Sequence, residues 1–265
     1  MIKGQSFVVL SITPWETALP SSGHFLFDRF SRENRVLFVD HPLTWKDLFR
    51  RENRPRVRRT LEGLASLGDP SRDLWLLSPP PLLPINGLPD GPEYEWLLER
   101  NARLVASSIK RAMKNLGMKQ PIFWNSFDVP LGYALLGKLE EGLRVYHCFD
   151  EIRGEAYIAR HGSRLEELLI QRSDLVLTSS AGLVRPGAHF VPNGVDHEHF
   201  AQALGPIAIP PDLLPLPRPL IGYWGHVESR LDYELLERLL LARPQYTLVL
   251  VGPVHPSFRE RVKRL

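Results

Sequence analysis

The sequence predicts an α/β fold that contains one complete parallel-sheet domain and the beginning of a second. Two observations support this prediction. Short, nearly continuous apolar segments alternate with amphipathic helical segments along most of the chain, and strands that are apolar on both faces are typical of a parallel sheet covered by helices on both sides. A proline-rich stretch near residues 205–219 interrupts the alternation. After it, the strand and helix pattern begins again.

Seven strands and four helices are predicted before the proline-rich stretch. Pro92 suits the first turn of the longest helix, because proline lacks the N–H group that a first-turn residue leaves unused. In chain order the predicted elements are a strand at 6–12, a helix at 23–33, strands at 35–40 and 73–79, a helix at 92–116, a strand at 121–127, a helix at 130–141, a strand at 144–151, a helix at 163–172, and strands at 174–180 and 188–193.

The segment after the proline-rich stretch has a predicted strand at 219–227, a helix at 231–242, a strand at 246–253 and a helix towards the end. We therefore expect a first Rossmann-like domain over residues 1–204, a linker over 205–218, and a partial second Rossmann-like domain over 219–265. The second segment is short for an independent domain. Either the chain is a fragment, or these elements pack onto the first domain.

Composition indicates a globular protein, with 43% hydrophobic and 24% charged residues. The net charge of only +3 gives no reason to expect a nucleic-acid partner. The single cysteine, Cys148, excludes an internal disulfide and a zinc site built from cysteines, and its apolar surroundings predict a buried thiol. The cytoplasm is the simplest compartment. No segment of the sequence is apolar over the length that spans a bilayer.

The stretch HFVPNGVDHEHF invites comparison with a metal site, because His189, His197 and His199 lie close together in it. However, Asn193 and Gly194 form the pair that best accepts a positive φ angle, so a strand that leaves the sheet through a sharp turn also explains the stretch. His197 and His199 are expected in an extended or turn segment, whereas metal ligands are usually held on a rigid element. We therefore predict no metal site.

The same stretch resembles GT-B glycosyltransferases, especially the large retaining group. There, a run of proline, asparagine, glycine, valine and aspartate leads from the N-terminal to the C-terminal domain, and VPNGVDHEHF supplies Pro192, Asn193, Gly194 and Asp196. The later segments IGYWGHV and YTLVLVGP resemble the first two strands of the C-terminal domain. In the first half, SGHFLFDRFSRENRVLFVDHP, DLWLLSPPPLLP, PIFWNSFD and RVYHCFDE resemble a subgroup similar to teichuronic-acid-type glycosyltransferases. The resemblance implies that the four named residues form an interdomain hinge.

The resemblance also implies an activity. The expected enzyme moves a sugar from a nucleotide-sugar donor to a saccharide or lipid-linked acceptor, between two Rossmann-like domains, in cell-surface polysaccharide biosynthesis. It implies a mechanism without a metal or other cofactor and with retention at the anomeric carbon. If the natural protein ends at Leu265, the donor site is incomplete, and the alternative is a truncated, non-catalytic homologue that binds an acceptor or a partner. A nicotinamide-dependent oxidoreductase is disfavoured, because no G-x-G-x-x-G follows the first strand.

The glycine-containing turn in IGYWGHVESRLDYELL is the predicted donor site. A strand that ends at glycines and leads into a helix presents backbone N–H groups and a positive helix end to a diphosphate, and Gly222 and Gly225 permit a close backbone approach. The resembled family places an arginine and a lysine against the diphosphate, and His226 and Arg230 take the corresponding places here. An ordinary strand-to-helix turn with a solvated Arg230 explains the same residues.

A second predicted site lies at the carboxyl edge of the first sheet, where open α/β sheets bind ligands. Ser22 and Gly23 supply donors at the start of the first helix on the acceptor side. His24 matches a histidine of the resembled subgroup and is predicted to be catalytic. Capping of the helix by Ser21 or Ser22 is the simpler interpretation of the serines.

Polar residues at two further strand ends complete the predicted site. Asp150, at the end of RVYHCFDE, is the preferred catalytic acid, because a carboxylate there could accept the proton of an acceptor hydroxyl. A helix cap at Asp150 is the simpler interpretation. Asn125 and Asp128, in PIFWNSFD, are assigned to the acceptor side.

The run RRENRPRVRR contains six arginines between Arg50 and Arg59. Such a run is usually a solvated face, but it could also bind anionic lipid headgroups or a lipid-diphosphate acceptor. We therefore expect a cytoplasmic protein with peripheral contact at the inner face of the cell membrane. Nucleic acid is the weaker alternative, because no aromatic residues are interleaved with these arginines.

Overall fold

The computed structural model of the chain describes residues 2–17, 20–67, 69–154 and 159–265. The chain divides into two compact units, Met1–Gly194 and Val195–Leu265, and each is described by itself. None of the described helices combines the length and apolar character that crossing a lipid bilayer requires.

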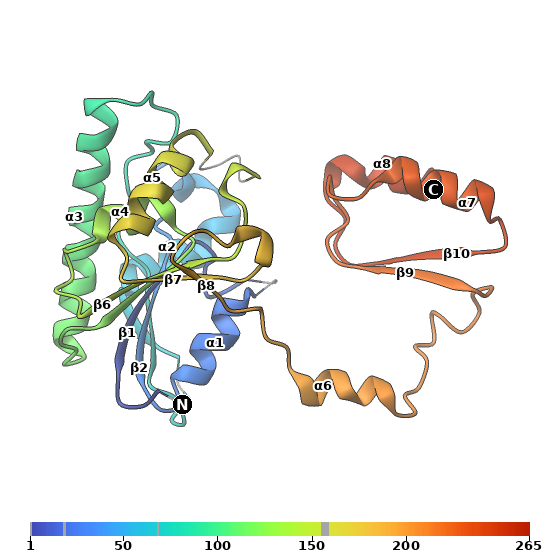
Figure 1. Cartoon of the computed structure of the whole chain (residues 1–265), viewed down its shortest axis with the longest axis horizontal. Helices are drawn as coiled ribbons and strands as arrows, with labels where there is room; N and C mark the ends of the chain where they lie inside the picture. Colours follow the sequence, from blue (N-terminus) through green and yellow to red (C-terminus); the bar gives the residue numbers. More distant parts are fainter. Residues whose placement is uncertain (1, 18–19, 68, 155–158) are drawn as a thin grey trace. The chain divides into compact units, whose positions relative to one another are not determined.

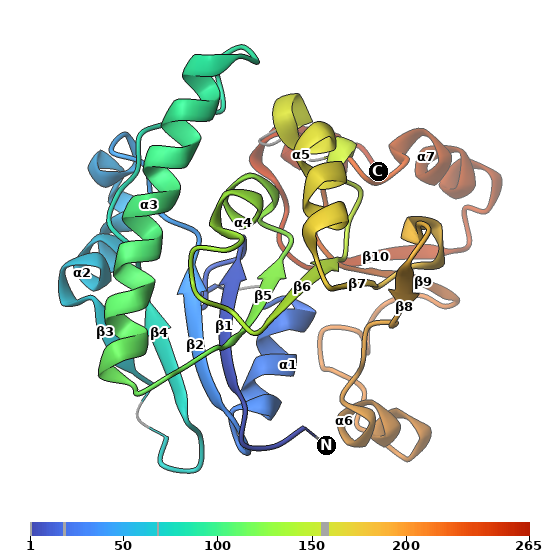
Figure 2. The same ribbon diagram turned by 60° about the vertical axis from the view of Figure 1, so that its left-hand side comes forward.

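The first unit is built on an eight-stranded sheet in the order β3-β4-β2-β1-β5-β6-β7-β8. Every neighbouring pair is parallel except β3 and β4, and Figure 2 shows β1, β2 and β5 pointing the same way. The predicted parallel sheet is confirmed. The strands are β1 (Ser6–Ser11), β2 (Arg35–Asp40), β3 (Leu64–Ser66), β4 (Leu74–Leu77), β5 (Ile122–Ser126), β6 (Leu143–Cys148), β7 (Leu175–Thr178) and β8 (Ala188–Phe190).

Helices cover both faces of this sheet, as the apolar strands require. Phe27 of α1 packs with Phe38 of β2 on one face, whereas Val105 of α3 and Leu135 of α4 belong to the larger core on the other. Figure 1 shows α1 on one side of the sheet and α3, α4 and α5 on the opposite side. The bounds are α1 (Ser22–Phe30), α2 (Arg54–Glu62), α3 (Pro92–Asn115), α4 (Val129–Leu135) and α5 (Ala159–Arg172), with 3-10 turns η1 (Asp47–Phe49), η2 (Arg51–Asn53), η3 (Ile152–Gly154) and η4 (Ala181–Leu183).

The sequence does not predict α2 or β3. On the face of helix α2 that packs against the rest of the first unit, arginines occupy positions where most helices have apolar residues. Arg59 is buried and forms an ion pair with Glu16, and Arg56 donates to the backbone after β2. The helix therefore lacks the apolar periodicity by which helices are recognised in a sequence. Strand β3 has only three residues, too few for a pattern.

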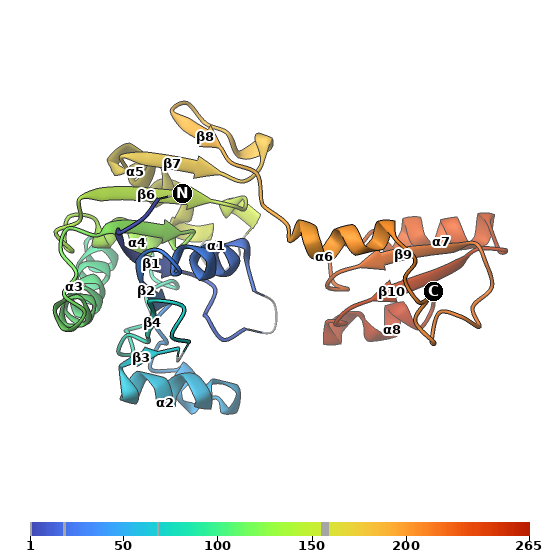
Figure 3. The same cartoon turned by 90° about the horizontal axis from the view of Figure 1, so that it is seen from below.

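The second unit contains two parallel strands, β9 and β10. Its helices α7 and α8 lie on the same side of this pair (Figure 1), and Figure 3 shows the two strands running side by side. Tyr233 of α7 stacks on Phe258 with ring centroids 5.3 Å apart, and Arg261 of α8 lies over the Tyr233 ring at 5.1 Å. The bounds are α6 (His197–Ala201), η5 (Gln202–Leu204), β9 (Leu220–Trp224), α7 (Tyr233–Ala242), β10 (Thr247–Val251), η6 (Pro256–Phe258) and α8 (Arg259–Val262).

The stretch that leads from one unit to the next differs from its prediction. Neither Asn193 nor Gly194 has a positive φ angle, so the expected sharp turn does not form. The sequence predicts an extended or turn segment for His197 and His199, but both lie in helix α6. The helix forms because the Asp196 carboxylate accepts the His199 N–H at 3.0 Å and caps it. The first unit ends at Gly194, and the domain bounds of 1–204 and 219–265 with a linker at 205–218 stay a prediction.

Candidate functional site

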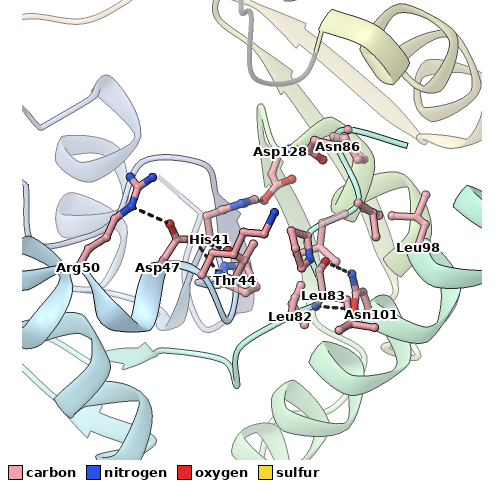
Figure 4. Close-up of a pocket in the computed structure, with 17 residues that line it drawn as sticks. His41, Thr44, Asp47, Arg50, Leu82, Leu83, Asn86, Leu98, Asn101 and Asp128 are labelled. Carbon is pink, nitrogen blue, oxygen red and sulfur yellow. Dashed lines mark hydrogen bonds and ion pairs between the residues drawn. The ribbon is translucent and has the colours of Figure 1, made fainter. Parts of the chain in front are cut away.

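A cavity of about 250 Å³ lies at the carboxyl edge of the first unit's sheet, and we call it the edge pocket (Figure 4). Strands β2 and β5 flank β1, and the helices that follow β1 and precede β5 cover opposite faces. Open α/β sheets bind ligands at such a point. The polar lining residues are His41, Thr44, Lys46, Asp47, Arg50, Asn86, Asn101 and Asp128, and the apolar ones include Leu82, Leu83, Pro84, Ile85, Leu98, Pro130 and Leu131.

His41 and Asp128 form the central polar pair of the edge pocket. His41 follows β2 and Asp128 follows β5, two strand positions or about 10 Å apart, and the side chains meet with His41 Nδ1 2.5 Å from Asp128 Oδ2. Asp128 is buried, with its side chain 2% exposed. Burial lowers the pKa of His41, but the charge and hydrogen bond of Asp128 outweigh burial, so the pKa of His41 is raised above 6.5.

A closed turn fixes the position of Asp128. The Asn125 side chain accepts the Asp128 N–H at 2.9 Å and donates to the Asp128 carbonyl at 3.0 Å. Between them Phe127 has a φ angle of 64°, which an L residue rarely adopts. Gly132 lies against the Asn125 amide so closely that an added Cβ would be 1.9 Å from Asn125 Nδ2. Asn125 therefore positions Asp128, and Gly132 makes room for Asn125.

Two further contacts shape the pocket. The Thr44 backbone N–H and hydroxyl both donate to Asp47 Oδ2, at 2.9 and 2.6 Å. Burial raises the pKa of Asp47, but these two bonds outweigh it and the pKa is lowered. On the apolar wall, the Asn101 amide accepts from the Leu83 N–H at 3.3 Å and donates to the Leu83 carbonyl at 2.9 Å, so the segment after β4 is held against α3.

The structure places the predicted residues of the first helix outside the edge pocket lining. His24 is buried between Trp15 and Phe38, with ring centroids at 5.2 and 5.4 Å. Its Nδ1 contacts the Ser21 N–H at 3.1 Å, and its Nε2 lies 2.9 Å from the Pro14 carbonyl. Both ring nitrogens thus have partners within the loop, which is the arrangement of a capping group. A catalytic role for His24 stays a prediction that these contacts do not support.

The neighbouring predicted residues lie at the start of α1. Ser21 is the N-cap, and Ser22 is the first helical residue. Gly23 packs tightly, because a Cβ at this position would be 3.2 Å from Ser126 Oγ. The simpler interpretation of a capped helix start describes these residues, and their acceptor role stays a prediction.

Asp150 lies beyond the end of β6 and is half-buried. Its Oδ1 accepts the Glu151 N–H at 2.9 Å. It does not line the edge pocket. Of the predicted acceptor and catalytic residues, Asp128 lines the pocket directly. Asn125 contributes through its hydrogen bonds to Asp128.

The predicted donor residues lie in and after β9. Gly225 has a φ angle of 153°, which favours glycine, and its carbonyl oxygen would be 2.1 Å from a Cβ at Gly252. Arg230 is largely exposed and pairs with the Glu228 carboxylate at 3.1 Å. The same carboxylate lies 3.6 Å from His226 Nδ1. Gly222 lies within β9, with open space where a Cβ would be.

The start of α7 differs from what a diphosphate site requires. The Asp232 carboxylate accepts the Leu235 N–H at 2.9 Å and caps the helix. A negative charge thus occupies the positive helix end that the prediction assigns to phosphate. Among the described residues, no group of three or more histidines, cysteines and acids is arranged to hold a metal ion. The predicted absence of a metal site stays a prediction.

Within the central polar pair, His41 is the residue that sequence reasoning misses. It belongs to VDHP, directly after an apolar strand, and a histidine at the carboxyl edge of a parallel sheet is a recognisable signal. Its partner Asp128 comes 87 residues later in the chain, and only the strand order brings the two together.

Comparison with known proteins gives the fold. No protein-family model matches the sequence, and no curated protein matches it significantly. Among solved structures, Anabaena Alr3699/HepE in complex with UDP and glucose aligns with 98% of this chain at 14% identity and a TM-score of 0.55. The UDP-forming α,α-trehalose-phosphate synthase of Burkholderia xenovorans, solved with glucose-6-phosphate, aligns with 99% at 12% identity and a TM-score of 0.53.

The chain spans 64% of the HepE chain and 69% of the synthase chain. A third structure, the N-terminal domain of Candida albicans trehalose-6-phosphate phosphatase, aligns with 99% of this chain and 67% of its own length, at 14% identity and a TM-score of 0.53. At this level of identity the matches describe the fold alone. They confirm the predicted GT-B-type α/β fold.

Proposed function

We propose that this protein is a glycosyltransferase that uses a nucleotide-sugar donor, and that the edge pocket of the first unit binds the acceptor. The His41–Asp128 pair carries the proposal, because a carboxylate-anchored imidazole in a ligand-sized pocket is what activation of a hydroxyl requires. The fold gives support, since a similar structure contains UDP and glucose.

In the proposed reaction, the acceptor hydroxyl oxygen attacks the anomeric carbon of the donor sugar. His41 accepts the hydroxyl proton, and the bond between the anomeric carbon and the nucleoside diphosphate breaks. Asp128 holds the ring through Nδ1 and stabilises the imidazolium that forms. By raising the pKa of His41, Asp128 also makes the neutral imidazole a stronger base. Asp150 and His24 stay alternative catalytic candidates from the sequence.

The stereochemical outcome distinguishes two forms of this proposal. Direct attack by a base-activated oxygen inverts the anomeric configuration. The resemblance to retaining, teichuronic-acid-type glycosyltransferases implies retention instead. We favour inversion, because His41 is placed to act on the acceptor. NMR of the product anomer decides: a retained configuration would reject His41 as the acceptor base and would leave glycosyl transfer itself intact.

The donor is assigned to the second unit, at Gly222, Gly225, His226 and Arg230. The acceptor class is a saccharide or a lipid-linked saccharide of cell-surface polysaccharide biosynthesis, used at the inner face of the cell membrane. His226→Ala and Arg230→Ala are each expected to weaken UDP binding about fivefold, because each removes one polar or charged contact to phosphate. Isothermal titration of the chain with UDP measures this, with the exposed Arg111→Ala as the control.

The decisive experiment is a screen of radiolabelled nucleotide sugars for transfer to saccharide and lipid-linked acceptors. We expect His41→Ala to lower kcat by about 100-fold or more, as removal of a general base does. The value of kcat/KM should rise with pH as His41 loses its proton. No transfer with any donor, together with no UDP binding, would reject the enzyme and favour a non-catalytic acceptor- or partner-binding homologue. The observation that favours this alternative is the Asp232 carboxylate, which caps the N-terminal end of α7 where a donor phosphate would bind.

A further inference from the structure

The segment between β2 and α2 carries aromatic rings and cations that point into solvent. Phe49 is 82% exposed and Trp45 is 49% exposed. Exposure of whole aromatic side chains is unfavourable in water and marks interaction surfaces. We call the following set the loop surface: Trp45, Lys46, Phe49, Arg50, Arg51 and Arg54, all of which are exposed.

These residues are close together. The segment is folded into the consecutive turns η1 and η2, and a 3-10 turn rises only about 2 Å per residue. The Cα atoms of Trp45 and Arg54 therefore lie at most about 30 Å apart, and nearer than that because η1 and η2 shorten the segment. Lys46 Nζ lies 5.9 Å from the Trp45 ring, so cation and ring share one patch.

The structure separates five of the six arginines of this region into two groups, and the sixth, Arg58, is exposed and pairs with Glu62 at 2.8 Å. Arg56 donates to the His41 carbonyl at 2.6 Å, and Arg59 is buried against Glu16. Both support the fold through these contacts. Arg51 and Arg54, by contrast, are exposed, and Arg50 is 62% exposed despite a 3.8 Å contact with Asp47. Three outward arginines thus lie in the same stretch of chain, residues 45–54, as Trp45 and Phe49.

We propose that the loop surface docks on an anionic lipid bilayer. Rings of tryptophan and phenylalanine insert at the boundary between headgroups and acyl chains, and arginine and lysine beside them pair with headgroup phosphates. A purely anionic partner, such as a nucleic acid or an acidic protein, would use the cations without a need for Phe49 to leave water.

The loop surface is continuous with the edge pocket, because Lys46 and Arg50 belong to both. The pocket also has an apolar wall at Leu83 and Leu131. Docking would hold the pocket at the headgroup level. If the proposed glycosyl transfer is correct, and this step rests on it, the acceptor is a lipid-linked saccharide rather than a soluble one.

Vesicle flotation of the full chain tests the docking without any reaction. We expect binding to vesicles of phosphatidylcholine with phosphatidylglycerol and little binding to phosphatidylcholine alone. Arg51→Glu/Arg54→Glu should lower the partition coefficient by at least about 25-fold, at about fivefold for each basic residue lost. Phe49→Ala should lower it by about tenfold. Binding of the parent should weaken in 0.5 M salt, where surface charges are screened.

Matched controls come from α3. Leu104 is an exposed apolar residue, 45% exposed, and Arg111 is an exposed cation, so Leu104→Ala and Arg111→Glu should bind as the parent does. Equal binding to both vesicle types would overturn the proposal. So would parent-like binding of Phe49→Ala, because an anionic partner other than a bilayer would then fit better. Vesicle binding with neither transfer activity nor UDP binding would reject the proposed function and leave the docking surface standing.

Discussion

Substitution of Gly132 by alanine tests how the site is held together. Alanine normally stabilises a helix by about 1 kcal/mol relative to glycine, and Gly132 lies within α4. Here the new Cβ would be 1.9 Å from Asn125 Nδ2 and 2.5 Å from Asn125 Cγ. Overpacking of this kind costs about 1–3 kcal/mol, and displacement of Asn125 endangers two hydrogen bonds to Asp128 of about 1 kcal/mol each. We expect a net loss of about 1–3 kcal/mol.

The chain provides its own probe for this measurement. Cys148 is the only cysteine, and it is buried in β6 of the first unit. Thiol labelling in a urea series therefore reports unfolding of the first unit without interference from the second. Gly182→Ala is the control, because its Cβ would meet only Ser180 Oγ at an ordinary 3.8 Å.

A double variant makes the test strict. Asn125→Ala removes the amide that Cβ of residue 132 would strike, so adding Gly132→Ala to it should cost little or even stabilise the helix. The two substitutions should thus be strongly non-additive. Additive losses, or a Gly132→Ala protein as stable as the parent, would show that the close approach of Gly132 to Asn125 does not control this turn.

Three further outcomes follow from single contacts. Burial raises the pKa of Cys148 to about 12, so maleimide or iodoacetamide at pH 8 should label the native chain far more slowly than the unfolded one. Because folding raises the pKa of His41 above 6.5, protonated His41 stabilises the folded chain. This stabilisation is fully present below the pKa of the unfolded chain, near 6.5, and is lost as pH rises through the pKa of the folded chain. Asp128→Asn should therefore cost about 1.5–3 kcal/mol at pH 5.5 and less at pH 9, as thiol labelling in urea measures. Asp232→Asn keeps a helix cap and removes a charge, so titration should show tighter UDP binding if phosphate lies at the α7 end, and an unchanged affinity would place phosphate elsewhere.

Much of the fold is predictable because the sheet is buried on both faces. Strands β1 and β2 agree with the sequence prediction to within one residue, since each is a nearly unbroken apolar run. Short or polar elements escape such reasoning. Helix α2 holds its place with arginines, and the α6 helix of five residues depends on one cap from Asp196. In both, specific polar contacts replace the apolar periodicity that a sequence displays.

The candidate site is predictable only in part, for a related reason. A sequence identifies polar residues at strand ends, and in this way Asp128 and Asn125 are found. It does not say which polar atoms satisfy one another. His24 and His41 are both histidines near the carboxyl edge, yet the first is enclosed by Ser21 and Pro14.

The contrast between these two histidines shows what distinguishes a capping group from a candidate base. The ring of His24 touches a backbone carbonyl and a serine within its own loop, so its polar contacts depend on residues nearby in sequence. The ring of His41 is held by a carboxylate from another strand end, and that carboxylate is fixed by Asn125. Local contacts of the first kind stabilise a loop. A carboxylate brought from a distant strand to orient an imidazole at a cavity raises the basicity of the ring, and this gives His41 the stronger claim to chemistry.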